Sequence, residues 1–73
     1  NLDWQSRELA TVGALAALPG AESQLQSHVG FSLNVGLTVP QLRDLADTLA
    51  QRGQHEAAGR ARAAIAQVEA AKK

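Results

Sequence analysis

The pattern of hydrophobic and polar positions divides the 73-residue chain into four helical segments separated by turn signals. The first segment opens at Asp3, a residue type suited to an N-cap, and residues 9–18 are apolar apart from Thr11. Pro19-Gly20 ends it, because proline lacks the amide hydrogen that the helical ladder needs. A helix that is apolar nearly all round is buried on most sides, so we expect this helix to have partners on several faces.

The second and third segments carry apolar residues at helical spacing. The second is expected over residues 21–35, with Gly36 beyond its end. Its buried stripe, spaced i, i+4 and i+8, consists of Leu25, Val29 and Leu33. Thr38 begins the third segment as an N-cap, and Gln41 completes a capping box, with Pro40 tolerated in the first turn. The buried face of the third segment is supplied by Leu42, Leu45 and Leu49.

The fourth segment, residues 54–71, is rich in alanine, with Ile65 and Val68 as its larger apolar residues. Alanine favours a helix but buries little area, which suits close packing against a neighbour. Since no strand pattern is present, we predict an all-α fold: a small antiparallel bundle of about four helices, forming one domain over residues 1–73.

Chain length and the absence of cysteine bear on how such a bundle is stabilised. A domain of this size buries only about 60% of its unfolded surface, and without cysteine it has neither disulfides nor thiol chemistry. Two histidines are too few for a structural zinc site, and we expect no metal and no cofactor. Subunit contacts are the remaining means of stabilising so small a fold, so we predict a homo-oligomer. Because the chain opens at Asn1 rather than methionine, we also expect an N-terminal segment before it.

The formal net charge is zero and both signs are interspersed, which disfavours nucleic acid and anionic membranes as partners. No apolar stretch approaches the roughly 18 residues of a membrane span, and no signal-peptide pattern is present. We therefore expect a soluble, cytoplasmic protein. Lys72-Lys73 is the only like-charge run of note. Residues 32–42 have a passing likeness to a helix-turn-helix motif, but Pro40 and the nearby Asp44 and Asp47 argue against DNA binding.

Two stretches of the chain resemble motifs of the carboxymuconolactone decarboxylase family. Residues 7–18, R-E-L-A-T-V-G-A-L-A-A-L, are similar to the family helix R-E-L-x-x-x-x-A-L-A-A-L. Residues 28–38, H-V-G-F-S-L-N-V-G-L-T, resemble the family's H-x-x-x-A-L-N-x-G-x-T. The resemblance covers roughly residues 2–49. Family members often carry Y-x-G-x-P before the last helix, where this chain has the sequence R-G-Q-H-E at residues 52–56.

The resemblance implies an alkylhydroperoxidase D-like helical subunit that forms trimers or hexamers, with active sites near subunit contacts. It also implies one of two chemistries. The thiol peroxidases of this superfamily use C-x-x-C-x-x-x-H, and counting back from His28 puts their cysteines at Ala21 and Gln24, neither of which can form a thiolate. The remaining chemistry is decarboxylation of a lactone acid in aromatic-compound catabolism. A catalytically silent oligomerisation module of the same family is the alternative.

His28 and Glu8 are the candidate catalytic residues. Decarboxylation leaves an enolate-like electron pair, and a histidine can deliver the required proton near neutral pH. Glu8 matches the glutamate that belongs to a proton relay with the histidine in the thiol-peroxidase branch, and here it could orient His28 or raise its basicity. The structural alternatives are a histidine bonded at a helix contact and an acidic residue favoured in the first turn of a helix.

Arg7 and Ser32 are the candidate substrate-binding residues. A guanidinium binds a carboxylate through two hydrogen bonds, although an exposed arginine is the simpler interpretation. Ser32 lies one turn after His28, so the two side chains could share a face and form a Ser–His pair. We expect Trp4 and Phe31 to be core or interface anchors, with Phe31 off the buried stripe and therefore an interface candidate.

Overall fold

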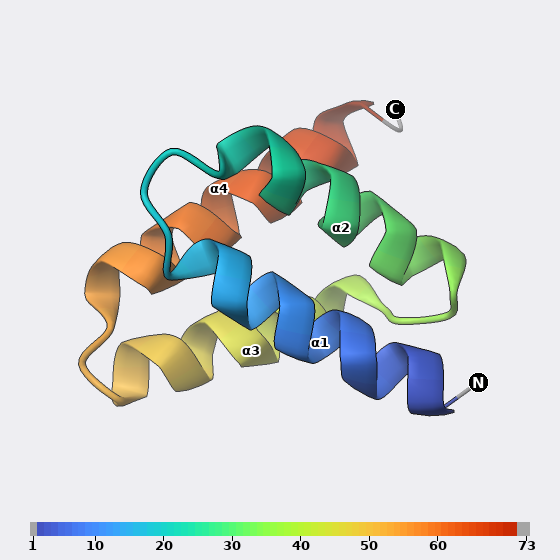
Figure 1. Cartoon of the computed structure of the whole chain (residues 1–73), viewed down its shortest axis with the longest axis horizontal. Helices are drawn as coiled ribbons and strands as arrows, with labels where there is room; N and C mark the ends of the chain where they lie inside the picture. The colour runs from blue at the N-terminus through green and yellow to red at the C-terminus, as the bar shows by residue number, and fades with distance from the viewer. Residues whose placement is uncertain (1, 72–73) are drawn as a thin grey trace.

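The computed structural model describes residues 2–71, which form four helices joined by short turns (Figure 1). They are α1 (Leu2–Ala16), α2 (Glu22–Asn34), α3 (Val39–Gln51) and α4 (His55–Ala71). No strand occurs within this range, and the predicted all-α bundle is confirmed. Lys72-Lys73, the like-charge run, and Asn1 lie outside the described residues.

The helices form two antiparallel hairpins, α1 with α2 and α3 with α4, as the ribbon in Figure 1 shows. Helix α4 packs against each of the other three. Every helix contributes to the core, whose members are Val12, Ala16, Leu25, Val29, Leu42, Ala46, Ala57, Ala61, Ala64 and Ile65. The residues from α4 fall at i, i+4, i+7 and i+8, one face of a helix. The alanine-rich helix is therefore the central element of the bundle.

Helix α1 differs from its sequence-based prediction at both ends. It begins at Leu2, so Asp3 lies in its first turn rather than at the N-cap, where its carboxylate still favours the helix dipole. It ends at Ala16 rather than Leu18, because Pro19 disfavours helical geometry in the residue before it. The Leu18 amide instead bonds to the Leu15 carbonyl at 3.1 Å, a tighter turn.

Past Arg7, the exposed side of α1 is made of small residues. Val12 and Ala16 face the core, whereas Ala10 and Ala14 are exposed, as is Ala17 just beyond the helix. The expectation that this helix has partners on most of its sides is therefore not met within one chain. None of the helices in the described part of the chain is long and apolar enough to cross a membrane.

The turn between α2 and α3 is fixed from both sides. On the α3 side the predicted capping box is present: the Thr38 hydroxyl accepts from the Gln41 amide, and the Gln41 side chain accepts from the Thr38 amide. On the α1 side, Gln5 Nε2 donates to the Val35 carbonyl at 3.2 Å. Gly36 between them has a φ of 104°, and a Cβ there would lie 2.8 Å from Gln5 Nε2. Glycine therefore suits this position through its positive φ, and it leaves room for the end of the Gln5 side chain.

Candidate active site

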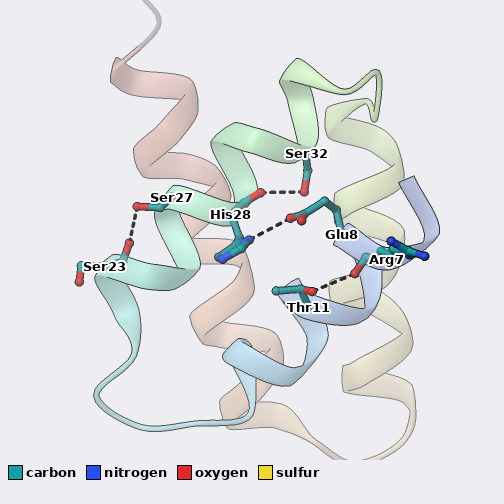
Figure 2. Close-up of polar contacts among 7 residues, drawn as sticks. All are labelled: Arg7, Glu8, Thr11, Ser23, Ser27, His28 and Ser32. Atoms are coloured by element: carbon teal, nitrogen blue, oxygen red, sulfur yellow. Dashed lines mark hydrogen bonds and ion pairs between the residues drawn. The ribbon is translucent and has the colours of Figure 1, made fainter. Parts of the chain in front are cut away.

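The contact between α1 and α2 brings Glu8 and His28 together. Glu8 Oε2 lies 3.0 Å from His28 Nδ1 (Figure 2). The Glu8 side chain is 8% exposed, whereas that of His28 is 41% exposed. A carboxylate is only an acceptor, so Nδ1–H donates to Glu8. This fixes the tautomer and leaves Nε2, on the side of the ring away from Glu8, for another partner.

The buried carboxylate is tolerated because it is hydrogen-bonded. Burying a carboxylate without a partner is costly. Across the contact between α1 and α2, called the α1–α2 seam below, Glu8 faces the His28 imidazole, which can carry the opposite charge. Among the described residues, no buried side-chain nitrogen or oxygen lacks a hydrogen-bond partner. The pair is thus a satisfied polar contact with one end in the protein and one end facing solvent.

Ser32 does not join this pair. Its hydroxyl donates to the backbone carbonyl of His28 at 2.7 Å, and the residue is fully buried. Serine in a helix commonly bonds back to the carbonyl four residues earlier. The hydroxyl is therefore bonded within its own helix, and the assignment of Ser32 as a substrate-binding residue or a partner of His28 stays a prediction.

Arg7 also lies apart from the pair, pointing away from Glu8 and His28 in Figure 2. Its side chain is 68% exposed, with the Asp3 carboxylate 3.9 Å away. Its guanidinium carbon lies 5.6 Å from the centroid of the Trp4 ring. Arg7 is therefore an exposed cation associated with an aromatic ring.

Trp4 and Phe31 meet across the same seam, a contact that our sequence analysis missed. Their ring centroids are 6.4 Å apart and the planes cross at 82°. Both are close to half exposed, at 49% and 43%. Trp4 precedes Glu8 by four residues and Phe31 follows His28 by three. In an antiparallel pair these positions face each other once Glu8 and His28 do, so this spacing was the signal available.

The remaining polar and hollow regions lie elsewhere. A pocket of about 410 Å³ lies where the end of α1 meets the α3–α4 turn, lined by Ala17, Gly53, Gln54, His55, Glu56, Ala57 and Arg60. Its lining does not include His28. His55 is exposed, as expected. Within residues 2–71, no three His, Cys, Asp or Glu side chains gather to hold a metal ion.

The positions that carry sulfur in the thiol peroxidases lie at the start of α2. Ala21 is the N-cap residue of that helix, and Gln24 is an exposed residue in its first turn. Arg60, from α4, was not anticipated as important, yet its Nε donates to the Ala16 carbonyl at 2.6 Å and closes the end of α1.

The four-helix fold agrees with the family that the two motifs resemble. The model of the carboxymuconolactone decarboxylase family matches residues 1–70, nearly the whole chain, and the chain belongs to this family. The match extends through residues 52–56, where the chain departs from the motif common in the family. A search of curated proteins and a search of solved structures returned no significant match.

Proposed function

We propose that this chain is a carboxymuconolactone-decarboxylase-like lyase that removes carbon dioxide from a lactone acid by acid–base chemistry at His28. The observation that carries the proposal is the 3.0 Å contact between a buried Glu8 carboxylate and a half-exposed His28 ring. A buried carboxylate that orients an imidazole while its far nitrogen stays open is the arrangement that acid–base catalysis uses.

The chemistry requires one proton to be placed on carbon. Breaking the carbon–carboxylate bond releases carbon dioxide and leaves its electron pair as an enolate conjugated with the lactone carbonyl. His28 in its imidazolium form delivers the proton from Nε2 to that carbon. Glu8 accepts a hydrogen bond from Nδ1–H and stabilises the positive charge of the imidazolium before the transfer. Solvent restores the proton on Nε2 afterwards. No thiol takes part, since the chain has no cysteine.

We further propose that the chain works as a homo-oligomer, a trimer or hexamer, in which the exposed apolar side of α1 contacts a second copy. The residues that support this are Ala10 and Ala14, exposed one turn apart on α1, and the exposed Ala17 and Leu18 in the turn that follows the helix. Light scattering at micromolar concentration should give a mass of several chains, and a uniform monomer with intact helical circular dichroism would contradict the assembly.

The test of the lyase is release of carbon dioxide from carboxymuconolactone. His28→Gln should lower turnover about 10²–10⁴-fold, equivalent to about 3–5 kcal/mol of barrier height, while the melting temperature stays close to wild type. His55→Gln is the matched control, because His55 is exposed on α4 and away from the seam. Equal activity in the two variants, or no release by folded wild-type protein, would refute the assignment.

The second candidate is a catalytically silent oligomerisation module. It is favoured by one observation: the pocket at the α3–α4 turn is not lined by His28. In that case Glu8 and His28 serve as a hydrogen-bonded contact between helices. His28→Gln would then lower the melting temperature or disturb assembly, and no lyase activity would be found in any variant.

A further inference from the structure

We propose that Trp4, Phe31 and Arg7 form a binding platform for a flat aromatic carboxylate, beside the Glu8–His28 pair. These three residues are called the aromatic platform below. The platform lies one helical turn from that pair, and its ligand class, an aromatic acid, goes beyond the lactone acid of the proposed function.

The first support is the gathering of exposed aromatic surface. Among the described residues, the large exposed hydrophobic side chains are Trp4, Leu18 and Phe31, and two of these three are in contact. The two ring planes cross at 82°, so the rings are arranged edge to face and are not stacked in parallel. A third ring packed in the angle between the two rings would bury apolar surface that is now exposed to water. It would also make the offset or edge contacts that aromatic rings prefer.

The second support is a cation at the edge of this surface. The Arg7 guanidinium lies 5.6 Å from the Trp4 ring centroid, so an acid bound on the rings has a complementary charge beside it. Asp3 already lies 3.9 Å from Arg7, but both side chains are more than two-thirds exposed, and solvent screens such a contact. A ligand carboxylate that makes two parallel hydrogen bonds to the guanidinium can displace it. An aromatic body with an anionic end fits both features.

The third support is position. Phe31 follows His28 by three residues on α2, and Trp4 precedes Glu8 by four on α1. Side chains at these spacings are neighbours on a helix surface, about 5–6 Å apart at Cβ. A ligand held by the aromatic platform is therefore within one helical turn of the imidazole.

The platform contains its own probe, because Trp4 is the only tryptophan and the chain has no tyrosine. The experiment is a titration of the full chain with benzoate, followed by Trp4 fluorescence. Cyclohexanecarboxylate has the charge without the aromatic ring, and benzamide has the ring without the charge. We expect a saturable change with benzoate, with a dissociation constant on the order of 1 mM, and a markedly weaker response to both controls. A response to cyclohexanecarboxylate equal to that of benzoate would overturn the proposal.

Variants separate the two halves of the platform. Arg7→Gln should weaken benzoate binding about five- to tenfold through the lost charge-assisted hydrogen bonds. Phe31→Leu keeps apolar bulk but loses the ring, and it should weaken binding about threefold. Arg43→Gln is the matched control, an exposed arginine that pairs with Glu69 on the other hairpin. Circular dichroism confirms that each variant folds, and equal binding by the Arg7 and Arg43 variants would refute the role of Arg7.

Different results would refute the aromatic platform and the proposed lyase activity. His28→Gln should lower carbon dioxide release about 10²–10⁴-fold but leave benzoate binding intact. Benzoate binding in a protein that never releases carbon dioxide refutes the lyase and supports the platform. Carbon dioxide release that is insensitive to Arg7→Gln and Phe31→Leu, with no benzoate response, refutes the platform alone. Trp4 emission that shifts to shorter wavelength with protein concentration, and does not respond to benzoate, shows a second copy on this surface and also refutes it.

Discussion

The two hairpins of this protein are built alike but held together by different chemistry. Between α1 and α2 lie a buried carboxylate, a histidine and two aromatic rings. Between α3 and α4 the buried residues are small or aliphatic, and the polar contacts are ion pairs at the surface. Charge is thus buried in one seam and kept in water in the other.

The two seams differ in what they contribute: the α3–α4 seam stabilises the fold, and the α1–α2 seam positions the groups for chemistry. Ion pairs exposed to water contribute little, so the α3–α4 seam depends on close apolar packing, which alanines allow by letting two backbones approach. A buried Glu–His contact contributes little net stability after desolvation is counted, but it places an oriented imidazole at the surface. We therefore expect substitutions in the α3–α4 seam to change folding, and those in the α1–α2 seam to change ligand chemistry.

The largest expected effect is on folding. Leu42 is fully buried and is the bulkiest residue that α3 places in the core, so Leu42→Ala leaves a cavity among alanines too small to fill it. The substitution should lower the free energy of unfolding by about 2–5 kcal/mol, measured by urea denaturation. The control is Leu45→Ala, the same change at a partly buried position of the same helix. A Leu42 cost no greater than that of Leu45 would show that packing does not dominate this seam.

The next largest effect is on turnover, and it tests the role of the α1–α2 seam. Glu8→Gln keeps an oxygen that can accept from His28 Nδ1 but removes the charge that stabilises the imidazolium. We expect turnover to fall about 10–100-fold, roughly 1.4–2.7 kcal/mol of barrier height, with the free energy of unfolding little changed. If the two residues act as a unit, Glu8→Gln combined with His28→Gln should be no slower than His28→Gln alone. Additive losses in that double variant would indicate independent roles.

Much of this arrangement was accessible from the sequence because it depends on local signals. The capping box at Thr38 was predicted correctly, since it involves residues three apart. The bond of the Ser32 hydroxyl to the His28 carbonyl was not predicted, because shared helix faces do not reveal that a hydroxyl prefers the carbonyl of the preceding turn. The Trp4–Phe31 contact was missed because it depends on the register between two helices. Glu8 and His28 were singled out through family resemblance, and only the fold supplies their distance.

A smaller effect tests whether the α3–α4 hairpin is fixed by local signals. Thr38→Ala removes the acceptor for the Gln41 amide at the start of α3. It should lower the free energy of unfolding by about 1 kcal/mol, read from the midpoint of thermal unfolding. Thr48→Ala is the control, because the Thr48 hydroxyl only bonds back to the Asp44 carbonyl within the helix. A Thr48 variant as destabilised as the Thr38 variant would mean that the cap has no special weight.

The smallest effect concerns the exposed ion pairs, which the comparison treats as nearly neutral. Arg62 lies 2.8 Å from Asp47 and links α4 to α3, but the two side chains are 52% and 57% exposed. A double-mutant cycle with Asp47→Ala and Arg62→Ala isolates the pair from the effect of each truncation on its own helix. The coupling energy should be about 0.2–1 kcal/mol in dilute buffer. It should shrink further at 1 M salt, where the screening length falls to about 3 Å. A coupling well above 1 kcal/mol that persists in salt would mean that this seam, too, relies on charge, and the division between the two hairpins would fail.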